Sequence, residues 1–220
     1  MPAPLPWLTA SCAPGALIFA LLAAALLAFW FLKRDAANYL TVDIKHYTQY
    51  YWQRRYGLML HVGGGFVALS VGLLQTYLGL SGRAARTHRG LGYVYLTAGA
   101  IATLAALYLA ATMTPMAPIY ASGLVGLALA WWLTTALAYL YIRRRQMLAH
   151  RAWMLRSYVV TFGFVTFRTV QLLLSSSGIT SEDRSYDVAA WACWTIPLLL
   201  VEPLIRSSLG TRQRRAAIRG

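Results

Sequence analysis

Two histidines occupy matching positions in two long apolar runs of the 220-residue chain. His88 and His150 each stand at the same end of their run, and each is followed directly by an arginine. Neutral imidazole nitrogens are frequent ligands of metal ions and of haem iron. The matched depth therefore predicts that His88 and His150 bind one metal ion, or the iron of one b-type haem, from opposite sides.

The arginines next to these histidines fit the same chemistry. Arg89 and Arg151 fall at the headgroup level of a membrane-spanning helix, where a planar guanidinium can pair with a haem propionate through two parallel hydrogen bonds. A second interpretation stays open at this point. A His-Arg pair at a helix end is also a common interfacial anchor, in which the histidine hydrogen-bonds a lipid phosphate.

A third histidine, His61, begins a helical stripe that continues through Gly65, Ala68 and Gly72 and carries almost no side chains. One hypothesis is that this bare face leaves room for a flat cofactor beneath a histidine ligand. The interpretation we favour is close packing against a neighbouring helix, with His61 hydrogen-bonded to that neighbour.

Three charged side chains also fall inside apolar runs, where an unpaired charge is costly. Arg156 and Glu202 lie at similar depth, and we expect them to form a structural ion pair between two helices. Arg168 has no acidic partner in any run. Together with His61 at similar depth it suggests a site for an anion, a quinone carbonyl or a carboxylate; alternatively, Arg168 extends its side chain to the membrane surface.

The elements that must position these residues are membrane helices. Hydrophobic residues make up 59% of the chain and charged residues 12%, whereas a soluble domain carries about 25% charged residues. This composition excludes a disordered chain and an ordinary soluble domain. A membrane span needs about 20 mostly apolar residues, and the sequence holds six such runs: 14–32, 56–79, 90–112, 117–142, 152–176 and 187–206.

The first run is interpreted as a span rather than a secretory signal, because no lysine or arginine precedes it. Six spans predict three regions. Residues 1–55 hold the first span and an aromatic segment, around 39–52, at the outer membrane interface. Residues 56–206 form a five-helix membrane core, and residues 207–220 form a basic cytoplasmic tail. The polar stretch 175–187 is expected to be a mobile loop.

The formal net charge of +14 raises the alternative of a nucleic-acid-binding protein. Its distribution argues against that class, because the arginines sit at the ends of spans with no recognisable binding module. Six spans bring most of them to one side, which the positive-inside rule makes cytoplasmic, against anionic lipid headgroups. These residues are Arg83, Arg86, Arg89, Arg143, Arg144, Arg145, Arg151, Arg206, Arg212, Arg214, Arg215 and Arg219.

No motif points to other chemistry. The sequence contains no zinc-ligand spacing, no phosphate-binding loop and no nucleophile elbow, so no cofactor besides haem is expected. Cys12 and Cys193 fall on opposite sides of the membrane in the six-span arrangement, and no disulfide is predicted between them.

Three motifs carry a resemblance to a known family. They are the glycine-rich span of His61 ending in Gly72-Leu73-Leu74-Gln75, then His88-Arg89-x-x-Gly92-x-x-Tyr95, then His150-Arg151-x-Trp153-Met154-x-Arg156-Ser157-Tyr158. Over residues 55–175 the chain resembles the bacterial predicted-membrane-protein family catalogued as domain of unknown function 2306. The resemblance implies a multi-span inner-membrane protein and no established reaction.

A looser similarity is to the six-helix, ascorbate-oxidised transmembrane cytochromes of the b type, which pair histidines on spans two and four and on spans three and five. His88 and His150 match the three–five pair. His61 matches half of the two–four pair, but span four has no histidine, so this similarity implies at most one haem.

These observations predict an all-α, polytopic protein of the bacterial inner membrane, with six spans and both termini in the cytoplasm. Two functions remain open. One is a redox protein that binds a single haem b between His88 and His150 and exchanges electrons with a quinone or another partner. The other is a non-catalytic accessory or scaffold subunit of a larger membrane complex.

Overall fold

The computed structural model describes residues 23, 26–41, 43–46, 48–81 and 84–219. All regular secondary structure in these residues is helical, which confirms the predicted all-α class. The long helices are α4 (Arg55–Ser81), α5 (Ala85–Met113), α6 (Pro118–Arg143), α7 (Met147–Thr161), α8 (Gly163–Ser177) and α9 (Glu182–Arg219).

These helices account for four of the six predicted spans, or for five if α7 and α8 cross the membrane as one bent span. Helices α4, α5, α6 and the apolar part of α9 are each long and apolar enough to cross a membrane, and α7 with α8 passes the same test as one bent span. The chain is therefore a membrane protein in contact with a lipid bilayer. Most of the predicted first span, 14–32, lies outside the described residues, so the count of six stays a prediction.

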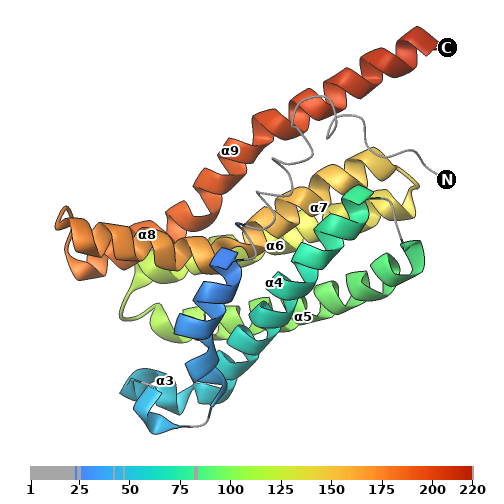
Figure 1. Ribbon diagram of the computed structural model, residues 1–220. Helices are drawn as coiled ribbons and strands as arrows, with labels where there is room; N and C mark the ends of the chain where they lie inside the picture. The colour runs from blue at the N-terminus through green and yellow to red at the C-terminus, as the bar shows by residue number, and fades with distance from the viewer. Residues whose placement is uncertain (1–22, 24–25, 42, 47, 82–83, 220) are drawn as a thin grey trace.

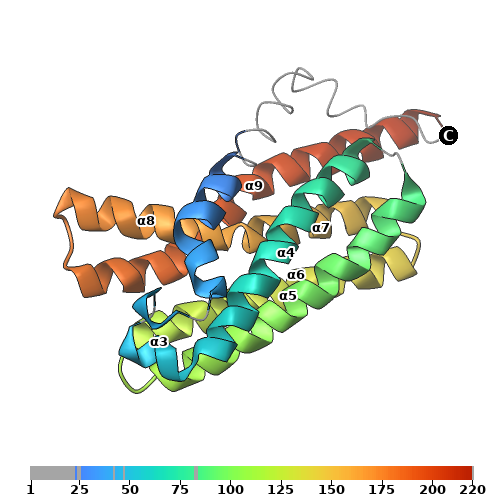
Figure 2. The same ribbon diagram turned by 60° about the horizontal axis from the view of Figure 1, so that its bottom comes forward.

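Helices α4, α5, α6 and α7 form a four-helix bundle. Contacts join α4 to α5, α5 to α6, α6 to α7 and α7 back to α4, which leaves α5 and α7 on a diagonal. Helix α9 packs on α6, α7 and α8 (Figures 1 and 2). The α6–α7 connection lies at the same end as the outer part of α9, while α3 (Gln49–Gln53) and the α8–α9 connection lie at the other end.

The segment before the bundle is built from short helical pieces. Residues 26–31 are α-helical and bury Ala28 and Phe31 against the bundle core. They are followed by η1 (Leu32–Ala36), η2 (Ala37–Leu40), η3 (Ile44–His46) and α3, which begins where the Thr48 hydroxyl accepts from the Tyr51 amide. The aromatic segment thus folds as consecutive short helices at one end of the bundle.

The structure departs from the predicted uninterrupted helix over 152–176. Helices α7 and α8 meet at Phe162 with a bend of 42°. The Thr166 hydroxyl lies 2.6 Å from the Cys193 carbonyl oxygen, a hydrogen bond that ties the start of α8 to α9. The amide of Val165 also bonds the carbonyl of Phe162 in a tighter, three-residue turn.

A second departure concerns the polar stretch 175–187, which was expected to be a loop. Helix α8 continues to Ser177, and α9 begins at Glu182. Glu182 and Asp183 occupy the first turn of α9, where negative charge is favoured by the positive end of the helix dipole. The connection is therefore much shorter than predicted.

Candidate functional site

A cavity of about 580 Å³ opens between α4, α5, α6 and α7, at the end of the bundle where α5 begins. We call it the His88–His150 chamber. Its lining includes the four residues that the sequence singles out as a possible haem site: His88, Arg89, His150 and Arg151. The diagonal placement of α5 and α7 brings both imidazoles into the bundle interior.

The His150 ring is oriented by the backbone of α6. Its Nδ1 lies 2.9 Å from the Ala138 carbonyl oxygen, and a carbonyl only accepts hydrogen bonds, so Nδ1 carries the hydrogen. The neutral ring then presents the lone pair of Nε2. A hydrogen bond of this kind, from one ring nitrogen to a backbone carbonyl, is how metal-binding histidines are usually held.

The His88 ring packs against α4, and one of its nitrogens has unused hydrogen-bonding capacity. Its Nδ1 is buried and has no hydrogen-bond partner among the described residues. Gly79 of α4 lies beside the ring, since a Cβ added there would be 3.3 Å from His88 Cε1. The Gln75 amide holds the backbone of α5 by donating to the His88 carbonyl oxygen. This nitrogen can therefore accept a hydrogen bond or bind a ligand that comes from outside the described residues.

The mouth of the chamber is basic. Arg143 of α6 joins Arg89 and Arg151 in the lining, a contribution that the sequence analysis had not assigned to the site. Its guanidinium carbon lies 6.0 Å from the Tyr139 ring centroid. The chamber therefore combines two imidazoles in its interior with three guanidinium groups, an arrangement suited to a flat ligand with anionic edge groups.

A layer of hydroxyl groups closes the inner end of this chamber. Tyr95 is fully buried, and its hydroxyl lies 2.8 Å from Ser157 Oγ and 2.7 Å from Thr161 Oγ1. Ser157 Oγ lies 2.7 Å from Thr135 Oγ1, and the Trp131 indole donates to Thr161 Oγ1 over 3.1 Å. We call these five residues the hydroxyl layer.

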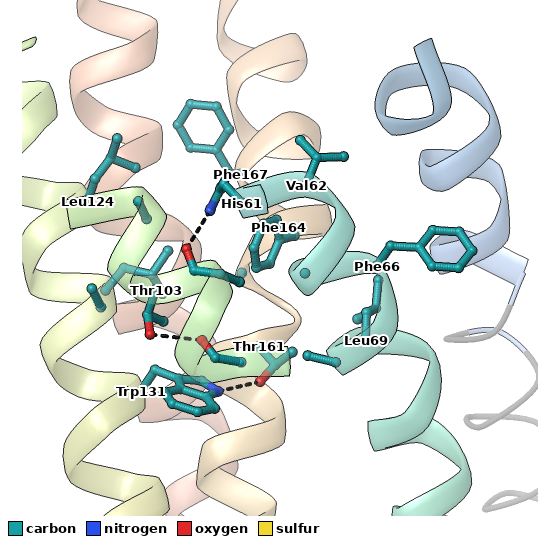
Figure 3. A pocket seen from close by; sticks show the side chains of 18 of the residues that line it. His61, Val62, Phe66, Leu69, Thr103, Leu124, Trp131, Thr161, Phe164 and Phe167 are labelled. Carbon is teal, nitrogen blue, oxygen red and sulfur yellow. Dashed lines mark hydrogen bonds between the residues drawn. The ribbon is translucent and has the colours of Figure 1, made fainter. Parts of the chain in front are cut away.

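On the far side of the hydroxyl layer is a second cavity of about 200 Å³, the His61 chamber (Figure 3). Helices α4, α5, α6, α7 and α8 and the segment before α4 all contribute to its lining. Both His61 and Arg168 line it, so the structure brings together the two residues that the sequence placed at similar depth.

His61 is hydrogen-bonded to a neighbouring helix, as the favoured interpretation predicts. Its Nδ1 lies 3.0 Å from the Ala102 carbonyl oxygen of α5, and its ring stacks on Phe164 with centroids 4.8 Å apart. The space left by the glycines is filled by aromatic rings: a Cβ at Gly65 would meet Phe164 at 2.5 Å, and one at Gly72 would meet Tyr158 at 2.5 Å. Close packing is thus confirmed along this stripe.

Arg168 is half-buried in the wall of the His61 chamber. In the described part of the chain no carboxylate pairs with it. Tyr51 and Tyr120 share a hydrogen bond nearby, and both feel the charge of Arg168. Burial raises the pKa of the Tyr51 hydroxyl, which keeps that group neutral and able to donate. The two tyrosines were not predicted as site residues.

The predicted ion pair between Arg156 and Glu202 is confirmed. Arg156 Nε and Nη2 donate to the two carboxylate oxygens of Glu202 over 2.9–3.0 Å. Arg206 adds a third contact, from its Nε to Glu202 over 2.8 Å. Neither chamber has these residues in its lining, so the pair stabilises the packing of α7 on α9.

No group of three or more His, Cys, Asp or Glu side chains gathers as a metal site in the residues that the structure describes. The buried Cys193 is a free thiol, and Cys12 lies outside the described residues.

Comparison with known proteins gives one match. The model of a family described as predicted membrane protein (DUF2306) matches residues 58–205. The match takes in α9 as well as the earlier spans, so it extends beyond the 55–175 stretch on which the sequence resemblance rests. No curated protein and no solved structure matches the chain.

Proposed function

The chain belongs to the DUF2306 family of predicted membrane proteins, and we propose that this member binds one b-type haem in the His88–His150 chamber and acts in membrane electron transfer. The observation that carries the proposal is the pair of imidazoles lining one cavity. His150 bonds Ala138 through Nδ1 and so presents its Nε2 lone pair, and His88 has a buried Nδ1 without a hydrogen-bond partner in the described part of the chain.

The ligand set suits haem better than a bare metal ion. A porphyrin supplies four nitrogens to its iron and needs two axial ligands from the protein, whereas a protein-bound zinc ion takes three or four protein ligands. His150, oriented by Ala138, and His88 would hold the haem iron. Haem bound there supplies one-electron redox chemistry; the protein sets its potential through the ligands and the surrounding apolar wall.

The basic mouth of the chamber has a role in the same proposal. Arg89, Arg143 and Arg151 would hold the propionates, and their charge would draw an anionic ligand to this end of the bundle. Gly72, Gly79 and Gly92 line the walls of this chamber. A Cβ at Gly79 would lie 3.3 Å from His88 Cε1, so the glycine leaves room for the imidazole ring.

The membrane setting belongs to this proposal too. We infer a sixth span within 14–32 from its apolar run, cytoplasmic termini from the distribution of arginines, and a bacterial inner membrane from the family resemblance. In that arrangement the His88–His150 chamber faces the cytoplasm, residues 56–206 are the membrane core, and residues 207–220 are a cytoplasmic tail.

The test is a reduced-minus-oxidised visible spectrum of the protein purified in mild detergent. We expect the bands of a six-coordinate b-type haem, and their loss in both His88→Ala and His150→Ala. The exposed neighbour Thr87 provides a matched control, and Thr87→Ala should keep the bands. His150→Met replaces one ligand by a thioether, so this variant should keep haem with a shifted spectrum and a higher potential.

Two results would overturn the proposal: no haem bands in the wild-type protein expressed with ample haem, or bands that persist in both alanine variants. Size-exclusion profiles of the variants, compared with the wild type, separate loss of ligand from loss of fold.

A further inference from the structure

The His61 chamber is a second, smaller cavity that the haem proposal leaves without a ligand. Its volume of about 200 Å³ suits one six-membered ring rather than a macrocycle. Its walls are mostly apolar and aromatic, including Phe164, Phe167 and Trp131 (Figure 3). Pockets for small organic molecules have this character, with a few placed polar groups that orient the ligand.

One of those polar groups is an acceptor. The Ala102 carbonyl oxygen accepts from His61, so Nδ1 carries the hydrogen and the neutral ring keeps a lone pair on Nε2. The stacking on Phe164 and the bond to α5 fix the ring in this orientation. A ligand that satisfies Nε2 must therefore bring a hydrogen-bond donor of its own.

The other placed polar group, Arg168, is a donor. Arg168 is half-buried, has no carboxylate partner among the described residues, and lies near the Tyr51–Tyr120 hydroxyl pair. A guanidinium group only donates hydrogen bonds. The ligand must therefore also bring an acceptor oxygen, and the chamber as a whole calls for a ring with a donor and an acceptor.

We propose that the His61 chamber binds the head group of a hydroquinone, the reduced form of a membrane quinone. One ring hydroxyl would donate to His61 Nε2, and the other oxygen would accept from Arg168. A carboxylate offers acceptors alone and leaves His61 unpaired, and so does the oxidised quinone. Binding in this chamber does not require haem in the other one, and the two proposals can fail separately.

The difference between quinol and quinone gives the experiment. The full chain in lipid nanodiscs without quinone is titrated under anaerobic conditions with decylubiquinol and with decylubiquinone, by calorimetry, with empty nanodiscs as the blank. One neutral hydrogen bond corresponds to a factor of about five in affinity. We expect the wild type to bind the quinol about fivefold more tightly than the quinone.

The variants separate the two polar contacts. His61→Leu should abolish the preference for quinol, whereas His61→Gln, which retains an acceptor oxygen, should restore part of it. Arg168→Gln should weaken the binding of both the quinol and the quinone about tenfold, because it removes a charged hydrogen-bond donor. Arg184→Gln removes an exposed arginine at the same end of the bundle and should leave both affinities unchanged.

Three results would overturn the inference: no saturable binding above the empty nanodiscs, equal weakening by Arg168→Gln and Arg184→Gln, or a quinol preference that persists in His61→Leu. Decanoate, titrated in parallel, tests the carboxylate alternative. If decanoate binds as tightly as the quinol and depends on Arg168 alone, the site is one for fatty acids. Spectra of the same samples report haem, so absence of haem with intact quinol binding counts only against the haem proposal.

Discussion

At the scale of single residues, the ion pair between Arg156 and Glu202 is the contact with the clearest energetic consequence. Both side chains are mostly buried, with relative exposures of 14% and 28%. Breaking a buried pair leaves one charge uncompensated and costs about 3–5 kcal/mol, less where water reaches the group. We expect Arg156→Gln to lower the free energy of unfolding by about 2–3 kcal/mol, measured by denaturant unfolding in detergent.

Arg206 supplies the control for this prediction. It binds the same carboxylate, but its side chain is 78% exposed, so Arg206→Gln should cost less than about 1 kcal/mol. Equal losses in the two variants would show that burial does not determine the strength of these contacts.

The polar contacts that the sequence predicted belong to residues with few possible partners inside the membrane. Glu202 is the one acid that lies away from the ends of the predicted runs, so Arg156 had an obvious partner. A histidine at membrane depth likewise needs a hydrogen-bond partner. The sequence did not predict the Tyr51–Tyr120 pair or the contribution of Arg143. Tyrosines and arginines are also common at membrane interfaces that hold no binding site, so these residue types alone do not indicate a cavity.

At the scale of the helices, Gly64 lies where the backbone of α4 comes close to the backbone of α5. A Cβ at Gly64 would lie 2.7 Å from the Ala98 carbonyl oxygen and 3.1 Å from Ala102 Cβ. Gly64→Ala therefore forces the helices apart, and we expect a loss of about 1–3 kcal/mol in stability from overpacking. The melting temperature in detergent is the measurement.

Gly90 of α5 provides the matched substitution. A Cβ there would meet nothing within 4 Å, so Gly90→Ala should be neutral or stabilising by up to about 1 kcal/mol through helix propensity. Similar destabilisation of both variants would count against close backbone contact as the reason for Gly64.

Hydropathy predicted where the later spans lie but not how they are shaped. Apolar runs of about 20 residues report the thickness of the bilayer, and five of the six match the observed helices. Beside the bend at Phe162, the Thr166 hydroxyl bonds the Cys193 carbonyl oxygen, and these residues are 27 positions apart. The local amino-acid composition does not predict a contact between residues so far apart in the chain.

At the scale of the whole molecule, the distribution of arginines makes a prediction about orientation. Reporter fusions after Arg144, between α6 and α7, and after Arg184, early in α9, should fall on opposite sides of the membrane, with Arg144 in the cytoplasm. Alkaline phosphatase and green fluorescent protein fusions measure this directly. Fusions on the same side would contradict a membrane crossing by α7 and α8 together.

The pairing of residues across the bundle was predicted only in part. The shared depth of His88 and His150, and of His61 and Arg168, follows from their positions along alternating spans. The arrangement of helices around a bundle does not follow from the order of spans, so neither the two cavities nor the boundary between them was anticipated.

The hydroxyl layer at that boundary has a consequence for proton movement. The Thr161 hydroxyl donates to the Ser157 carbonyl oxygen, so Tyr95 must donate to Thr161, Ser157 to Tyr95, and Thr135 to Ser157. Every hydroxyl in this row therefore donates in the same direction, from Thr135 through Ser157 and Tyr95 to Thr161. The last hydrogen of the row is donated to a backbone carbonyl oxygen, which has no hydrogen of its own to pass on. Among the described residues, these hydrogen bonds therefore form no continuous proton path from one chamber to the other.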